Sequence, residues 1–185
     1  MDNDHPAIEP YLYPPAACDD YDPYAPTVAA LVAGLITRRL PALSVEHIGS
    51  TSIPGCAGKG VVDLMVLPPP GHLEAAKRLL ADLGFQPQPN ANPHPESRPC
   101  RVGTIWYEGR PFRLHVHVIP PQSPEIEQQR AFRARLRADP QMVATYVAHK
   151  RAAIAAGHTD AARYNAGKES FIASVLHTGE APQAT

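Results

Sequence analysis

The segment that most constrains the fold is a short apolar run, Val61–Leu67, that contains a single acidic residue, Asp63. Its length suits a strand, and its nearly continuous apolar character is typical of a central strand buried on both faces. A carboxylate in such a strand is costly unless it is paired or binds a cation. The run therefore predicts a central strand in which Asp63 has a structural or a functional reason to be present.

The residues in front of this strand are typical of a phosphate-binding loop. Residues 44–48 predict a short strand, and residues 49–60 predict a loop of small residues. Gly49 lets the backbone approach a ligand closely. Ser50 and Thr51 offer hydroxyl and amide groups to phosphate oxygens, and Lys59 adds a positive charge. A capped turn, with Asp63 bonded to neighbouring loop amides, explains the same pattern equally well.

A later strand, predicted over residues 112–119, places three polar side chains on one face. Strand alternation puts Arg113, His115 and His117 on that face and apolar residues on the other. Two histidines separated by one residue on a strand can share a metal ion, and Arg113 suits phosphate. A half-solvated polar face is the alternative, which the pattern alone favours over a metal site.

The last predicted helix, over residues 160–177, carries a tyrosine and a lysine on one face. Tyr164 and Lys168 lie four residues apart, so they can close a pocket over a ligand, although a solvated lysine is the commoner case. An earlier predicted helix, which follows Ser123, has four closely spaced arginines. They are Arg130, Arg133, Arg135 and Arg137. Because they spread around the helix, they add little support for nucleic-acid binding.

The order of predicted elements favours an α+β fold, with a small mixed sheet flanked by helices and a helical C-terminal half. Further helices are expected over residues 27–39, 72–83 and 140–156 and after Ser123, and a further strand over residues 102–107. Residues 86–98 predict a surface loop. One domain is expected over residues 21–177, with flexible tails at 1–20 and 178–185.

Composition limits the classes of protein to consider. The net charge is −1 with histidine neutral, so no global field attracts nucleic acid or an anionic membrane. No apolar run approaches the roughly 20 residues of a membrane span, and the N-terminus lacks the features of a signal peptide. The three cysteines have neither the spacing of a zinc site nor an even number for disulfides. A cytoplasmic protein is expected.

Residues 46–55, followed by Lys59 and residues 62–64, closely resemble the signature of the GrpB family. Residues 21–26, 114–116 and 131–137 resemble three further stretches of that family. In the helical half, the resemblance continues at single positions. These are Tyr146, Lys150, Tyr164, Lys168, Phe171 and Ile172. The similarity covers roughly residues 20–177. Tyr24, in place of the family's tryptophan, and His117, in place of an apolar residue, depart from the pattern.

The GrpB family looks like a branch of the nucleotidyltransferase superfamily. In that superfamily, a Gly-Ser pair after a strand binds a nucleoside triphosphate, and carboxylates on following strands hold two magnesium ions. Gly49 and Ser50 match the pair, and Asp63 matches the first carboxylate. Met65 occupies the position where the superfamily has its second carboxylate. The later strand carries His115 and His117. The resemblance thus implies catalysis at Asp63 with Mg²⁺, Mn²⁺ or Zn²⁺ as the cation, but puts the two-metal mechanism in question.

Three functions remain open at this point. The first is an enzyme that transfers a nucleotidyl group or acts on another phosphorylated small molecule. The second is a non-catalytic module that retains the phosphate loop. The third, with the least support, is a protein-interaction domain.

Overall fold

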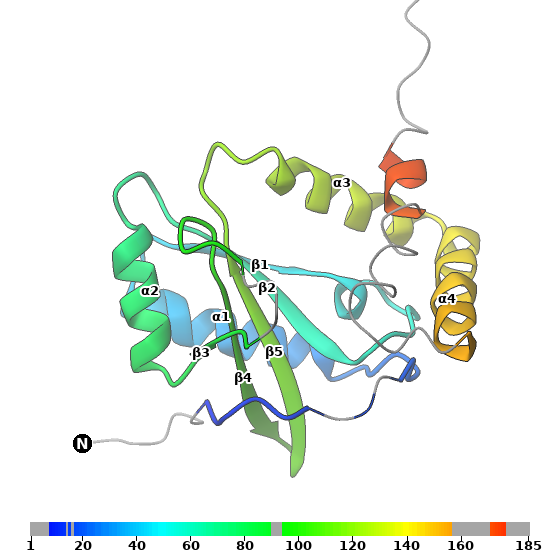
Figure 1. The fold of residues 1–185 in the computed structure, drawn as a ribbon, viewed down its shortest axis with the longest axis horizontal. Helices are drawn as coiled ribbons and strands as arrows, with labels where there is room; N and C mark the ends of the chain where they lie inside the picture. Colours follow the sequence, from blue (N-terminus) through cyan, green and yellow to red (C-terminus); the bar gives the residue numbers. More distant parts are fainter. Residues whose placement is uncertain (1–7, 14, 16, 90–93, 157–170, 177–185) are drawn as a thin grey trace, which may run out of the picture.

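The computed structural model describes residues 8–13, 15, 17–89, 94–156 and 171–176. Its centre is a five-stranded sheet in the order β1-β2-β5-β4-β3 (Figure 1). The strands are β1 (Ser44–Ile48), β2 (Val61–Leu67), β3 (Gln86–Pro87), β4 (Cys100–Tyr107) and β5 (Arg110–Val118). The central pair, β2 and β5, is parallel, and the other pairs are antiparallel. The predicted mixed sheet is therefore confirmed.

One face of the sheet packs against α1 (Ala25–Arg39) and α2 (Leu73–Asp82). Alternate residues of the central strands supply this core. They are Val62, Leu64, Val66, Leu114, Val116 and Val118, all fully buried. Because side chains alternate along a strand, Asp63, His115 and His117 must then lie on the opposite face. The predicted arrangement of polar residues on one face of β5 is confirmed.

The opposite face is partly covered by α3 (Glu125–Ala138), while α4 (Pro140–Ala155) follows it toward the loop after β1 (Figure 1). Ile126 of α3 packs with Ile48, Met65 and Ile119 on this face. Farther along, both helices pack against the loop between β1 and β2 through a second apolar cluster. Its main members are Ile53, Cys56, Ala57, Phe132, Leu136, Tyr146 and Val147. The helical C-terminal half thus supports the loop.

Two helix starts follow simple local rules. The first helix begins at Ala25, two residues before its predicted start, with Pro26 in its first turn, where a missing N–H has no cost. The fourth begins at Pro140, as predicted. There the Asp139 carboxylate caps the helix by accepting hydrogen bonds from the amides of Gln141 and Met142 at 2.9 and 3.1 Å.

The N-terminal segment differs from the predicted flexible tail of residues 1–20. Glu9 and Thr104 exchange two backbone hydrogen bonds of 2.8 and 2.9 Å, and the neighbouring Ile8 is buried. The physical reason lies in β3, which is only two residues long and leaves the rest of the β4 edge without a strand partner. Asp19 forms a similar bridge with Gly58. Residues 8–20 therefore contribute to the folded domain wherever they are described.

Several predictions fall partly or wholly outside the described residues. Residues 171–176 are helical, in agreement with the last predicted helix, but Tyr164, Lys168 and the tail at 178–185 lie outside that part. The loop predicted over residues 86–98 contains the short strand β3. Among the described helices, none is long and apolar enough to cross a membrane.

Candidate functional site

Gly49 and Asp63 lie in direct contact because of strand register. Ile48 pairs with Asp63 across the antiparallel β1–β2 pair, so the loop leaves β1 directly beside the carboxylate. Gly49 has φ = 69°, a left-handed conformation that favours glycine. A Cβ atom at this position would lie 2.3 Å from Oδ2 of Asp63. The backbone can approach the carboxylate this closely only because residue 49 is glycine.

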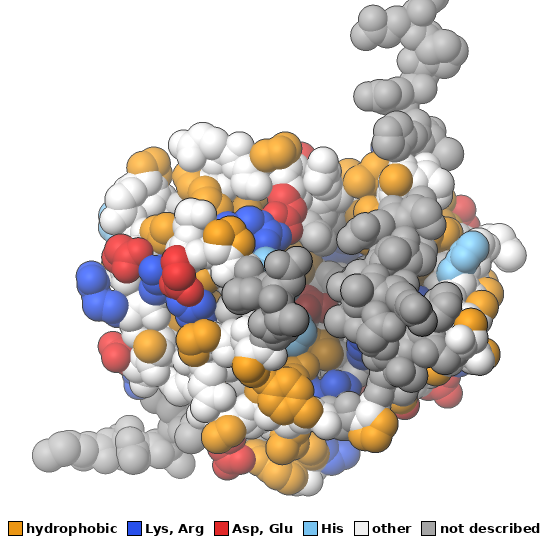
Figure 2. Space-filling view, viewed as in Figure 1, with side chains coloured by type: hydrophobic (Ala, Val, Ile, Leu, Met, Phe, Trp, Pro, Cys, Tyr) orange, Lys and Arg blue, Asp and Glu red, His pale blue; other side chains and the backbone are white. Residues whose placement is uncertain are grey.

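The parallel β2–β5 register brings two histidines to the same carboxylate. Asp63 is opposite His115, and His117 follows on the same face. Nδ1 of His115 and Nε2 of His117 each lie 3.6 Å from Oδ1 of Asp63. One ligand atom from each of the three side chains can be chosen so that all lie within 4.8 Å of one another. Figure 2 shows acidic and histidine side chains meeting near the middle of this face.

The two histidines differ in their affinity for protons. Burial lowers the pKa of His115 to about 4, against the opposing effect of Asp63. Burial also disfavours the charged form of His117, but interaction with Asp63 and then with Cys100 outweighs it and raises the pKa of His117 to about 10. Nε2 of the neutral His115 lies 3.0 Å from the hydroxyl oxygen of Tyr11. Burial raises the pKa of Tyr11. A neutral imidazole beside a carboxylate suits a metal ligand.

The loop after β1 is held in place by its own hydroxyl groups. Thr51 donates its hydroxyl proton to the carbonyl oxygen of Val61 at 2.9 Å, so it accepts at 3.0 Å from Nε2 of His47. Ser52 donates to the carbonyl oxygen of Gly49 at 2.7 Å. Burial lowers the pKa of His47 to about 4, which keeps this imidazole neutral. The hydroxyl of Thr51 therefore supports the loop from inside the fold.

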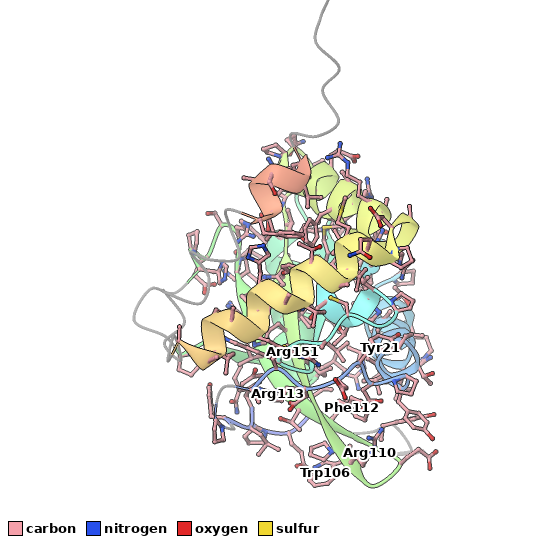
Figure 3. The ribbon with its side chains drawn as sticks, turned by 90° about the vertical axis from the view of Figure 1, so that its right-hand side faces the viewer. Tyr21, Trp106, Arg110, Phe112, Arg113 and Arg151 are labelled. Carbon is pink, nitrogen blue, oxygen red and sulfur yellow. The ribbon has the colours of Figure 1, made fainter. Side chains whose placement is uncertain are left out.

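The remaining predicted phosphate contacts lie around the same loop. Ser50 contacts the Gly58 region, since a Cβ at Gly58 would lie 2.7 Å from Oγ of Ser50. Lys59 is half-buried, and its carbonyl oxygen accepts a hydrogen bond from Arg113. Figure 3 shows Arg113 nearer to α4 than Trp106 and Arg110, which lie toward the far end of the β4–β5 hairpin.

A small pocket opens beside Gly49 and Ser50, between the loop and the C-terminal helices. Its lining combines amide and aromatic side chains with aliphatic ones. The lining residues are Gly49, Ser50, Gln128, Gln129, Phe132, Tyr146, Ile172 and Leu176. A planar aromatic group bound here would have rings to stack on and amides to bond to.

The arginines of α3 fasten the helix to the sheet and the loop. Arg130 and Arg133 both donate to the carboxylate of Glu46, whose pKa is lowered by the bonds to Arg130 and then Arg133 in spite of its burial. Arg137 donates to the carbonyl oxygen of Ser52 at 2.8 Å through Nε. These contacts explain the run of basic residues without nucleic acid.

Sequence reasoning missed some residues around the site. Lys150 has no predicted role at the site, but it is only 4% exposed, with Nζ 3.3 Å from Sγ of Cys56 and 4.3 Å from the ring centre of Tyr146. Tyr11 and His47 also adjoin the site. The helical spacing of Lys150 and Tyr146 is a signal that they share a face. No comparable signal identifies Tyr11, whose contact depends on the path of the N-terminal segment.

The histidine pKa values predict how stability depends on pH in the metal-free protein. Between pH 6.5 and pH 4, His47 and His115 take up protons in the unfolded chain but not in the folded one. The free energy of unfolding therefore decreases as the pH is lowered through this range. The slope is up to about 1.4 kcal/mol per pH unit for each histidine. The contribution of His117 is complete below pH 6.5 and is lost as the pH rises toward 10.

We therefore expect maximal stability near pH 6.5, measured by urea unfolding across pH in the presence of a chelator. His115→Gln should reduce the acid slope, and His117→Gln should flatten the alkaline one. Stability that does not fall between pH 6.5 and pH 5 would contradict the assignment of His47 and His115 as buried neutral groups.

The fold and the site together define an α+β protein in which a Gly-Ser loop touches a carboxylate on the adjacent strand. The profile described as GrpB protein matches residues 15–178. The chain belongs to the GrpB family, which confirms the sequence prediction. A UPF0157 protein of Pseudomonas aeruginosa is 36% identical over 149 residues, 79% of this chain and 58% of that protein. A UPF0157 protein of Vibrio cholerae is 32% identical over 162 residues, 87% of this chain and 77% of the relative.

Two solved structures extend the comparison. The crystal structure of conserved protein GrpB from Enterococcus faecalis gives a TM-score of 0.68 at 23% identity, covering 88% of this chain and 98% of that one. It confirms the α+β fold. A cytoplasmic RNA terminal U-transferase gives a TM-score of 0.47 at 12% identity, covering 73% of this chain and 41% of that one. The chain spans little more than half of the Pseudomonas relative.

Proposed function

We propose that this protein binds a nucleotide or another phosphorylated small molecule at the Gly49–Ser50 loop, together with a divalent cation at Asp63. The observation that carries the proposal is the contact of Gly49 with Asp63, where a Cβ would lie 2.3 Å from Oδ2. A loop of small residues held against a carboxylate can place phosphate oxygens and a cation next to each other. The polar strand face beside it supplies further ligands.

Each predicted residue has a role in this arrangement. Asp63 holds the cation with His115, and His117 lies beside them as a third ligand. Gly49 and Ser50 contact the phosphate, and Thr51 holds the loop in shape. Lys59 and Arg113 add positive charge near the loop. Tyr164 and Lys168, which lie outside the described residues, are proposed to close over the ligand.

The proposed activity is transfer of a nucleotidyl group to an acceptor, with release of pyrophosphate, or another reaction at phosphorus that needs one cation. A non-catalytic binding module is the second candidate, and one observation favours it. Met65, at the place of a second carboxylate, is fully buried in the core formed with Ile48, Ile119 and Ile126. A thioether buried in this way cannot replace a carboxylate as a ligand for Mg²⁺.

A thermal-shift experiment tests the proposed ligand. Nucleoside triphosphates are added with Mg²⁺, Mn²⁺ or Zn²⁺, each nucleotide at about 100 times its dissociation constant, which stabilises a fold by roughly 2.7 kcal/mol. We expect a shift that requires the cation and is lost in Asp63→Asn, a substitution that keeps the shape and removes the charge.

Asp82→Asn, an exposed position on α2, is the matched control and should retain the shift. An equal shift in Asp63→Asn would contradict the proposed binding of a cation at Asp63. The absence of a shift with every combination of nucleotide and cation would contradict the proposed binding of a nucleotide. Turnover assays with the stabilising pair then separate the transferase from the binding module.

A further inference from the structure

A second group of metal-ligand atoms lies beside His117, on the side away from β2. Cys100 is directly opposite His117 in the antiparallel β4–β5 register, so their side chains are neighbours on one face. The ring of His94 meets the ring of His117 edge-on, with centroids 5.6 Å apart and planes at 80°. One ligand atom from each of His94, Cys100 and His117 can be chosen so that all lie within 4.8 Å of one another.

The two ring nitrogens of His117 have different surroundings. Nε2 faces Oδ1 of Asp63 at 3.6 Å. Nδ1 is buried, and within the described part of the chain it has no hydrogen-bond partner. A buried polar atom without a partner costs about 1–3 kcal/mol, so a native structure that retains one calls for an explanation. A cation that takes the place of a proton on this nitrogen and binds its lone pair provides one.

The other two side chains are chemically suited to the same cation. Cys100 is only 2% exposed, and its sulfur lies 4.0 Å from the carbonyl oxygen of Arg101, too far for a strong hydrogen bond. His94 also offers a lone pair, because Nδ1 accepts at 2.7 Å from Arg98, which can only donate. Arg98 keeps both of its bonds to Glu125 if a cation takes the place of this contact.

We propose that His94, Cys100 and Nδ1 of His117 bind a thiophilic divalent cation of the zinc class. Two imidazoles and one thiolate are a ligand set that Zn²⁺ selects over Mg²⁺, and three protein ligands leave a fourth position open. Zinc–ligand distances are about 2.0–2.3 Å, so the three side chains close inward on the ion.

This assignment gives Asp63 a second role. When the cation occupies Nδ1 of His117, Nε2 keeps its proton and donates it to Asp63. A carboxylate that orients a metal-bound histidine in this way fixes its tautomer and strengthens its binding. His117 then binds the zinc ion instead of the cation at Asp63, and Asp63 and His115 remain as the ligands of that separate cation of the proposed nucleotide site. The zinc site does not depend on that function.

The test uses the full chain, stripped of metal by a chelator and titrated with Co²⁺ as a spectroscopic probe for Zn²⁺. We expect about one equivalent of Co²⁺ to produce a thiolate-to-cobalt charge-transfer band in the near ultraviolet, and Zn²⁺ to abolish it by displacement. Cys100→Ser and Cys100→Ala should both lose the band and bind Zn²⁺ at least about 100-fold more weakly. Cys18→Ser, at a partly buried cysteine outside the cluster, is the matched control and should keep the band.

His94→Gln should also weaken Zn²⁺ binding, with folding of each variant verified by circular dichroism. The proposal is overturned if the wild-type protein gives no band, if the band survives in both Cys100 variants, or if binding requires His115 and not His94. Nucleotide-dependent thermal shifts with Mg²⁺ are measured in the same variants. Because Cys100 is not part of the nucleotide site, retention of those shifts shows that failure of the zinc site leaves the proposed function standing.

Discussion

Replacing Gly49 with alanine is expected to lower the free energy of unfolding by about 2–6 kcal/mol and to abolish ligand binding at Asp63. Two effects add. At φ = 69° an alanine is strained by about 1–3 kcal/mol. Its methyl group would also lie 2.3 Å from Oδ2 and 3.0 Å from Cγ of Asp63, so the loop or the carboxylate must move. Urea unfolding measures the stability, and the thermal-shift screen measures the binding.

Gly55→Ala is the matched control for this prediction. Gly55 has nearly the same conformation, with φ = 74°, but a Cβ there has nothing within 4 Å. Gly55→Ala should therefore lower the free energy of unfolding only by the backbone strain, at the low end of about 1–3 kcal/mol. It should retain ligand binding. Equal losses for the two variants would show that the loop yields freely around Asp63. In an Asp63→Ala background, Gly49→Ala should cost less, because the carboxylate oxygen it meets is gone.

The sequence predicts the part of the site that depends on strand periodicity. The apolar run around Asp63 identifies the central strand, and alternation on the later strand places His115 and His117 on one face. Because a parallel pair in register aligns Asp63 with His115, the three residues meet as soon as these two strands are neighbours. The family signature identifies Gly49 and Ser50 independently of this geometry. These predictions need only local patterns and one strand pairing.

The remainder depends on contacts that leave no local pattern. Cys100 meets His117 only through the register of the β4–β5 hairpin, which the length of its turn decides. His94 lies on an irregular loop, and Tyr11 reaches His115 because the N-terminal segment follows the exposed edge of β4. The spacing of the cysteines argues against a zinc site made of cysteines alone. It does not test a mixed site formed by one cysteine and two histidines from separate segments.

Tyr146→Ala is expected to lower the free energy of unfolding by about 3–5 kcal/mol, as for other large aromatic side chains removed from a core. Tyr146 is 2% exposed and meets Phe132 edge-on at 5.5 Å and Phe171 in a stack at 4.9 Å between ring centroids. It also lies under the ammonium group of Lys150. The ring thus joins α4, α3 and the helical residues 171–176. Denaturation in urea, with the midpoint compared to wild type, measures the loss.

The consequence for function follows from what this cluster supports. Ile53, Cys56 and Ala57 of the loop pack in the same cluster, and Tyr146 lines the pocket beside Gly49 and Ser50. Loss of the ring should therefore increase hydrogen exchange of the loop amides at residues 50–58 more than that of the central strands. Tyr146→Phe keeps the ring and should retain most of the stability. Tyr13→Ala, at a tyrosine that is 65% exposed, is the reference variant. If Tyr146→Ala lowers the free energy of unfolding no more than Tyr13→Ala does, the helical half does not hold the loop. The loop conformation would then have to come from its own hydrogen bonds, those of Thr51 and Ser52.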